Sequence, residues 1–387
     1  MTEMKKYLCL KRTACIFMML QWSLLSFPQG MVINHNCVQI RQIPESAILA
    51  AKQNLHIAYG HTSHGSQLTT GMTGMVAFMN GLGYPNNLYA WNNGGTSGAL
   101  DLHDYAMGGD VGYYPDWVNN TRTYLGTPNS TTGRGTGANA DVNVIIWSWC
   151  GQVTSKYVAG TLNSEYLVPM TQLEADYPGI KFIYMTGHLD HSADASNKAA
   201  NQMIRDYCAT NNKILYDFAD IESYNPDKTF FQYAGDDCSY YSPTGTLLGN
   251  WATEWQNTHT ENSDWYSCSS AHSQPLNANQ KAYGAWWLWA RLAGWDGSAT
   301  GVNDVTRNVN PVTAYPNPSD GIFTLRSVDN QDYTVEIYNI IGNKVYTASD
   351  ISSSASEVID LSGQPKGLYL LKIKGSSKSF VEKIIIR

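Results

Sequence analysis

The stretch LHIAYGHTSHGSQLTTGMTGMVAFMNGL (55–82) changes its pattern twice within 28 residues. Residues 55–60 are a short apolar run, which is typical of a buried strand, and residues 67–82 carry apolar side chains at helical spacing. Between them, residues 59–67 contain two histidines, two serines and two glycines. The stretch therefore predicts a strand, a polar turn that exposes its side chains, and a helix.

The same alternation continues along the chain. Further short apolar runs and further helical patterns follow one another, at 142–149, 180–187 and 213–219 for the runs and 162–177, 196–211 and 277–294 for the helices. Alternating strands and helices predict a three-layer α/β domain of flavodoxin type, with a parallel sheet between two layers of helices. We expect this domain to span residues 31–297. Two long polar insertions, 83–140 and 220–275, are expected to build its site at the carboxyl ends of the strands.

The composition excludes some classes of partner. The chain of 387 residues is 43% hydrophobic and 15% charged, with a net charge of -7. Nucleic acids and anionic membranes need clustered Lys and Arg, so neither is expected as a partner. The 25 Tyr and 12 Trp fit either a large core or a surface that stacks on sugar rings.

The N-terminus predicts export. A basic segment precedes the apolar run 13–27, which indicates a signal peptide over residues 1–30 and no membrane span in the mature form. Five cysteines then remain, so at least one thiol is unpaired. Cys238 and Cys268 both lie in Ser- and Tyr-rich loop sequence and are the expected disulfide pair.

A second unit follows a polar linker at 298–311. Residues 312–387 show short alternating strands separated by Gly-containing turns, the pattern of a small β-sandwich. The segments YPNP (315–318), EIYNIIGNKV (336–345) and GLYLLKI (367–373) closely resemble the C-terminal sorting domain of type IX secretion cargo. This resemblance implies the type IX secretion machinery as a partner, and a secreted or surface-attached protein.

The polar turn is a candidate nucleophile site. Ser63 lies between the predicted strand and helix, where a helix N-terminus favours a developing oxyanion. HTSHG (61–65), with Gly65 at its end, is similar to the G-x-S-x-G elbow. His272 precedes the last helix of the domain. A serine after the first strand and a histidine before the last helix resemble the order of the SGNH/GDSL hydrolases, which implies Ser63 as nucleophile and His272 as general base.

The chain departs from the pattern of that family. The acid of that family stands three residues before the histidine, where this chain has Ser269. The nearest replacements in the same insertion are Asp236, Asp237 and Asp264. Gln152, after the strand 142–149, is the expected oxyanion donor, with His61, His188 and Gly65 supporting the site. We predict a serine esterase or deacylase that acts on an acylated carbohydrate and needs no cofactor.

Three other classes of protein remain open. The pairs His61/His64 and His188/His191 follow two predicted strands and could, with Asp190 or Asp194, bind zinc in a metal-dependent hydrolase or lyase. The carboxylates of YDFADIES (216–223) could serve a glycosidase or a calcium site, although capping and turn formation are commoner roles. The chain could also be a non-catalytic surface protein that binds carbohydrate or mediates adhesion.

Overall fold

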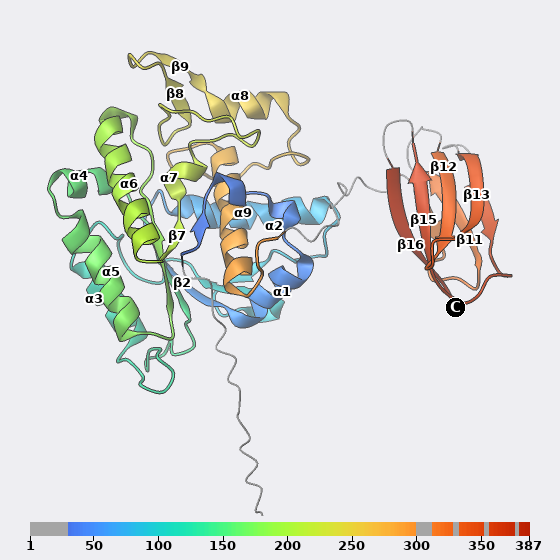
Figure 1. Cartoon of the computed structure of the whole chain (residues 1–387), viewed down its shortest axis with the longest axis horizontal. Helices are drawn as coiled ribbons and strands as arrows, with labels where there is room; N and C mark the ends of the chain where they lie inside the picture. The colour runs from blue at the N-terminus through green and yellow to red at the C-terminus, as the bar shows by residue number, and fades with distance from the viewer. Residues whose placement is uncertain (1–29, 299–311, 328–332, 352–355, 376–378) are drawn as a thin grey trace, which may run out of the picture.

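The computed structural model describes residues 30–298, 312–327, 333–351, 356–375 and 379–387 (Figure 1). The predicted signal peptide and linker lie outside these ranges, except for residues 30 and 298. The first unit is built on a seven-stranded parallel sheet of order β1-β7-β6-β5-β2-β4-β3. Its strands are β1 (Val32–Ile33), β2 (His56–Gly60), β3 (Trp91–Asn92), β4 (Leu100–His103), β5 (Val144–Trp147), β6 (Lys181–Met185) and β7 (Ile214–Tyr216).

Helices cover both faces of this sheet (Figure 1). One layer contains α1 (Glu45–Asn54), α2 (Ser66–Gly81) and α9 (Pro275–Leu292). The other contains α3 (Asp116–Leu125), α4 (Val153–Val158), α5 (Val168–Asp176) and α6 (Asp194–Thr210), with a π-helical turn, Asn163–Leu167, before α5. The predicted parallel α/β architecture is confirmed.

The insertion after β7 has structure of its own. It contains α7 (Phe218–Ile221), the hairpin of β8 (Ser239–Tyr241) and β9 (Leu247–Asn250), and α8 (Trp251–Thr258). Short 3₁₀ turns occur at His35–Cys37, Ile40–Gln42, Thr96–Gly98 and His191–Ala193.

The core of the first unit is continuous across both layers. The central strands β2, β5 and β6 are almost entirely buried, which is why their sequences are apolar runs without alternation. Helices α2 and α9 approach closely at Gly71, where a Cβ atom would lie 2.2 Å from the backbone oxygen of Ala278. This contact fixes the N-terminal ends of both helices near the carboxyl edge of the sheet.

The second unit is made of two antiparallel sheets. One has the order β10 (Val312–Tyr315), β11 (Ile322–Ser327), β14 (Ser356–Asp360), and the other β13 (Lys344–Ile351), β12 (Tyr333–Asn339), β15 (Gly367–Lys374), β16 (Ser379–Ile386). Their alternating apolar residues form a separate buried cluster that includes Phe323, Val335 and Ile384. The predicted sandwich-like C-terminal unit is confirmed.

The expected disulfide is not formed. All five cysteines of the described residues carry free thiols. The Cys238 thiol lies 3.2 Å from the Ser273 hydroxyl, whereas the Cys268 thiol faces the Pro275 carbonyl at 3.8 Å. The prediction was wrong because each thiol is satisfied by a different neighbour at the start of α9.

Candidate active site

Three loops meet at the carboxyl edge of the sheet. Ser63 and His64 follow β2, Cys150 follows β5 and His188 follows β6, and these three strands are neighbours in the sheet. Chain order reverses at β2 and β5, because β4 and β3 continue on one side of β2 and β6 and β7 on the other side of β5. Ligands of doubly wound sheets bind in the crevice at such a reversal. The fold therefore brings the predicted turn to the expected place.

The turn after β2 is packed tightly against β5. A Cβ atom at Gly65 would lie 2.1 Å from the Ser148 hydroxyl and 2.4 Å from the Cβ atom of His61, so only glycine fits. The Tyr59 hydroxyl donates to the Gly65 carbonyl at 2.9 Å, and the Ser66 hydroxyl donates to the Ser63 carbonyl at 2.7 Å. These contacts fix the backbone that carries Ser63 and His64.

His64 connects a nucleophilic pair to a carboxylate. Its Nδ1 lies 3.5 Å from Cys150 Sγ, which in turn lies 3.1 Å from Ser63 Oγ. Its Nε2 lies 2.9 Å from the Asp236 carboxylate, in the loop before β8. A nucleophile on one ring nitrogen and an acid on the other is the arrangement of a general base held in one orientation. Of the three predicted replacement acids, Asp236 reaches the cluster.

The surroundings of His64 and Asp236 favour a neutral imidazole beside an ionised carboxylate. Burial lowers the pKa of His64, although the hydrogen bond to Asp236 opposes this effect. Burial alone would raise the pKa of Asp236, but the hydrogen bond from His64 and the charges of His188 and His64 bring it below its ordinary value. At neutral pH, Asp236 is therefore ionised and His64 has a free lone pair.

Two more imidazoles stack on His64. The ring of His188 lies 3.9 Å from it at an interplanar angle of 6°, and the ring of His272 lies 4.3 Å from it at 15°. His188 Nδ1 lies 2.6 Å from the Leu189 carbonyl, while its Nε2 is buried and has no hydrogen-bond partner in the described structure. His272 has φ +62°, a left-handed conformation that is uncommon for a residue with a side chain.

The predicted residues are only partly brought together. Ser63, His188 and His272 lie in the cluster, but among the described residues no hydrogen bond joins Ser63 to His272. The Gln152 side chain accepts from the Cys150 N–H at 3.1 Å and donates to Asp110 at 3.3 Å, so it lies beside the cluster with both ends engaged.

Of the four predicted zinc-binding histidines, two lie together and the other two lie elsewhere, each in its own surroundings. His64 and His188 lie together, and with Asp236 their ligand atoms are within 4.8 Å of one another. His61 is buried beside Asp104, at 2.7 Å, and lies between two tyrosine rings. The His191 ring stacks on Tyr241 at 3.5 Å. The other predicted acids are also engaged elsewhere, with Asp237 at Ser239, Asp264 at Thr260, Asp190 at Ser192 and Asp194 at Lys198.

A buried ion pair holds the loops that carry His188 and His272 in place. Lys281 of α9 and Glu222 after α7 are both fully buried, and Lys281 Nζ lies 2.6 Å from Glu222 Oε2. Lys281 also donates to Gln67 of α2, and Glu222 accepts from the N–H of Leu189, next to His188. The Gln67 amide donates to the Ala271 carbonyl, next to His272, at 2.5 Å. The network thus holds the backbone beside both stacking histidines.

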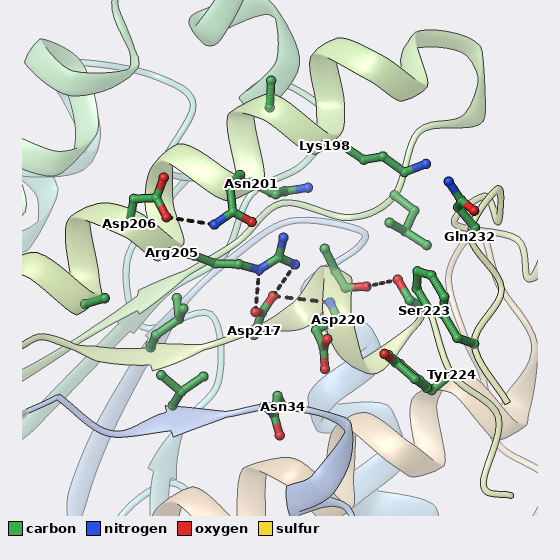
Figure 2. Close-up of a pocket in the computed structure, with 18 residues that line it drawn as sticks. Asn34, Lys198, Asn201, Arg205, Asp206, Asp217, Asp220, Ser223, Tyr224 and Gln232 are labelled. Carbon is green, nitrogen blue, oxygen red and sulfur yellow. Dashed lines mark hydrogen bonds and ion pairs between the residues drawn. The ribbon is translucent and has the colours of Figure 1, made fainter. Parts of the chain in front are cut away.

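A cavity of about 840 Å³ lies on another part of the unit (Figure 2). It is lined by residues of α6, β7 and the following loop, and its charged groups are paired within the protein. Arg205 donates to Asp217 at 2.6 and 2.8 Å, and His35 lies 2.6 Å from Asp220. None of the clustered residues lines this cavity. These pairs also explain the predicted YDFADIES carboxylates, which have structural partners.

Sequence reasoning missed Cys150, Asp110 and the Lys281–Glu222 pair. Cys150 was counted among the cysteines but not given a role, although in WSWCGQ (147–152) it follows a buried strand, as Ser63 does. That shared position was an available signal. No signal in the sequence indicates that a lysine and a glutamate 59 residues apart meet in the core.

The fold and the cluster thus define a parallel α/β unit in which a serine, a cysteine, a histidine and a carboxylate lie in contact, followed by an antiparallel β unit. Residues 313–387 match the family model described as "Secretion system C-terminal sorting domain". This match confirms the predicted sorting domain, which indicates export by the type IX machinery to the cell surface or the extracellular space. A search of curated proteins gives no match. Among the described residues, no helix is long and apolar enough to cross a membrane.

Three solved structures show limited similarity to this chain. An immunoglobulin-like β-sandwich protein of the DUF3244 family from Bacteroides vulgatus is 26% identical over 19% of this chain and 82% of that chain, with a TM-score of 0.17. PorZ, a surface component of the type IX secretion system of Porphyromonas gingivalis, is 18% identical over 21% of this chain and 12% of that chain, with a TM-score of 0.17. The endo-β-1,4-mannanase of Thermotoga petrophila is 10% identical over 85% and 64%, with a TM-score of 0.20. These scores carry no argument about function.

Proposed function

We propose that the α/β unit is an exported hydrolase of SGNH-like topology that cleaves esters by acyl transfer through a covalent intermediate. The observation that carries this proposal is the position of His64. One ring nitrogen faces a nucleophilic pair and the other is held by the Asp236 carboxylate. A neutral imidazole so placed can take a proton from the nucleophile and return it to the leaving group.

The contacts favour His64 as the base, in place of His272. Ser63 keeps its position on the turn after β2, and His272 keeps its position before α9, as the resemblance to SGNH/GDSL hydrolases implies. However, His64 contacts Cys150, and Cys150 contacts Ser63. The reaction class is the same whether Ser63 or Cys150 attacks the acyl carbon.

Backbone N–H groups are available for the oxyanion. The Gln152 side chain is engaged by Cys150 and Asp110, so its backbone is the better candidate donor. Within the described structure, the N–H groups of Gly151 and Gln152 donate to no acceptor. Gly151 has φ +85°, a conformation that turns the chain sharply after Cys150. An oxyanion formed at this turn could accept from both groups.

Exposed aromatic residues beside the cluster support a carbohydrate ester as substrate. Tyr105, which stacks on His61, is 59% exposed, and so is Tyr113. Gly112 packs against the Gln152 side chain, where a Cβ atom would lie 2.5 Å from the amide carbon, so Tyr113 follows directly after a contact with the site. Exposed tyrosine faces stack on sugar rings. Export to the cell surface makes polysaccharides accessible to such a site.

A metal-dependent hydrolase is the second candidate, and one observation favours it. His64, His188 and Asp236 place three potential ligands within 4.8 Å of one another. An imidazole binds a metal along a lone pair in the plane of its ring, so two rings that are stacked in parallel do not direct their lone pairs at one ion. Zinc binding would therefore require one of the two rings to turn. The serine or cysteine mechanism needs no such rearrangement.

Hydrolysis of p-nitrophenyl acetate and of acetylated xylan by residues 30–387 tests this proposal. We expect His64→Gln to lower kcat/KM by about 10²-fold or more, because the proton acceptor is lost. His191→Gln is the matched control, since this histidine stacks on Tyr241 and belongs only to the predicted metal set. Activity that is abolished by EDTA and restored by zinc would instead support the metal-dependent candidate.

A further inference from the structure

We propose that Cys150 supplies the attacking atom, and that Ser63 is a hydrogen-bond donor to its sulfur. This inference rests on the proposed acyl-transfer function and names the nucleophile of the same site. Cys150 Sγ lies between Ser63 Oγ, at 3.1 Å, and His64 Nδ1, at 3.5 Å. A proton can leave the thiol for His64 directly, whereas Ser63 has no histidine within hydrogen-bond reach in the described structure.

The surroundings of Cys150 also suit a thiolate. A thiolate accepts hydrogen bonds but donates none, and the Ser63 hydroxyl is placed to donate to it. His64, once protonated, stays held by the Asp236 carboxylate at 2.9 Å and forms an ion pair with the sulfur. A thiol beside an imidazole that can become charged is the usual setting of a reactive cysteine.

His188 gives an independent indication that a ligand binds at this turn. It is 9% exposed, and its Nε2 is buried without a hydrogen-bond partner. This nitrogen lies 3.7 Å from the position that a Cβ atom of Gly151 would occupy, directly after Cys150. Because the Leu189 carbonyl can only accept, Nδ1 of His188 carries the ring proton and Nε2 keeps its lone pair in the neutral ring. A hydroxyl group or water bound beside Cys150 would satisfy it.

The reaction balances without a cofactor. His64 takes the thiol proton, and the sulfur attacks the acyl carbon of the ester. The C–S bond forms, the C–O bond to the alcohol breaks, and His64 returns the proton to the leaving oxygen. Water then attacks the thioester while its proton passes to His64. The C–S bond breaks, the carboxylic acid leaves, and the thiol regains its proton.

The other described cysteines provide internal controls. Burial raises the pKa of the Cys37 thiol above its ordinary value. It raises the pKa of Cys208 and of Cys238 to about 12, and the pKa of Cys268 to about 11. A raised thiol pKa leaves little thiolate at neutral pH, and the thiolate is the species that reacts with alkylating agents. Cys150 is half-buried and faces an imidazole instead.

The first measurement locates the acyl group. Residues 30–387 are mixed with p-nitrophenyl acetate, quenched in acid and digested with trypsin, which separates Ser63 (residues 53–122) from Cys150 (residues 135–156). We expect acetyl on 135–156, sensitive to hydroxylamine at neutral pH as a thioester is, and on neither peptide in Cys150→Ala. Acetyl on 53–122 that persists in Cys150→Ala would overturn the inference, while leaving the proposed function standing.

The second measurement does not depend on turnover. Iodoacetamide alkylation at pH 7 is followed peptide by peptide, and we expect Cys150 to react at least 10-fold faster than Cys37. His64→Gln should remove this difference, whereas His191→Gln should keep it, and circular dichroism checks that both variants fold. Fast, His64-dependent alkylation without any acetyl transfer would support an activated thiol and count against the proposed function. Alkylation of Cys150 no faster than of Cys37 would overturn the inference.

Discussion

His64 is a buried imidazole whose protonation is set by a small number of neighbours. Burial lowers its pKa from an ordinary value of 6.5, the Asp236 hydrogen bond raises it, the His188 charge lowers it, and the charges of Glu222 and Asp236 raise it. Cys150 and the ring of His272 are the other groups in contact with it. Because its pKa is lowered, His64 is still mostly neutral at pH 6.5 and becomes protonated only at lower pH. Activity should therefore extend into mildly acidic conditions and fall as His64 becomes protonated.

The first prediction concerns Asp236→Asn. Loss of the carboxylate removes contributions that raise the pKa of His64, so the acid limb of kcat/KM should move to still lower pH. The maximum should fall by about 10²-fold or more, because the ring loses the partner that orients it. A pH–rate profile of each variant measures both effects. Asp237→Asn is the matched control, since this carboxylate accepts from Ser239 instead. A wild-type acid limb above pH 6.5, or an unchanged profile in Asp236→Asn, would contradict the assignment.

The sequence predicts where the residues of the candidate site lie in the fold better than it predicts their contacts. Ser63 and His272 could be placed because a strand–turn–helix pattern and the last helix are local features. The contacts of His64 with Cys150 and Asp236 span 86 and 172 residues. They depend on which strands are neighbours and on the direction in which each loop leaves the sheet. Neither property can be inferred from a local sequence pattern, so His64 and Asp236 could not be paired from the sequence alone.

At the scale of elements, long periodic segments were predicted well and short ones were missed. The helices predicted at 196–211 and 277–294 are observed at Asp194–Thr210 and Pro275–Leu292. The strand predicted at 142–149 is shorter, Val144–Trp147, because residues 148 and 149 already belong to the loop that carries Cys150. Strands β1 and β3 have two residues each, too few to show a period, and their place depends on the neighbouring strand.

The second prediction concerns the buried pair that links α2, α7 and α9. Lys281→Met leaves Glu222 charged and without its cation in the core, so we expect the free energy of unfolding to fall by about 3–5 kcal/mol. Burial lowers the pKa of Lys281, an effect that the Glu222 charge opposes, so the pair is already held against a large desolvation cost. Denaturant unfolding followed by tryptophan fluorescence measures the change.

The double variant Glu222→Gln/Lys281→Met is the control for this pair. The glutamine amide keeps an acceptor for the Leu189 N–H, and no charge is left unpaired, so this variant should be more stable than Lys281→Met alone. Because the pair also holds the backbone beside His188, the single variant should lower kcat as well. A double variant that is less stable than Lys281→Met would show that Glu222 stabilises the core even without its cation, through contacts such as the one with the Leu189 N–H, and would contradict this account of the pair.

At the scale of the whole molecule, the two units have separate buried cores. The buried cluster of the α/β unit and that of the β unit have no residue in common. The sorting domain matches residues 313–387, and the clustered site residues lie between positions 63 and 272. Hydrolysis and export should therefore be separable. Eleven of the 12 tryptophans lie between residues 91 and 295, and the twelfth is Trp22 in the predicted signal peptide, so in residues 30–387 tryptophan fluorescence reports on the first unit alone.

The third prediction is that deletion of residues 312–387 abolishes export but leaves the α/β unit intact. The tryptophan-detected unfolding midpoint should stay the same, because the core of that unit loses no residue. Hydrolysis by the purified shortened protein should equal that of residues 30–387. In a bacterium with a working type IX system, the full chain should appear at the surface or in the medium, and the shortened chain should remain within the cell envelope. A lowered midpoint would show that the two units stabilise each other, and export without residues 312–387 would show that another segment of this chain directs its secretion.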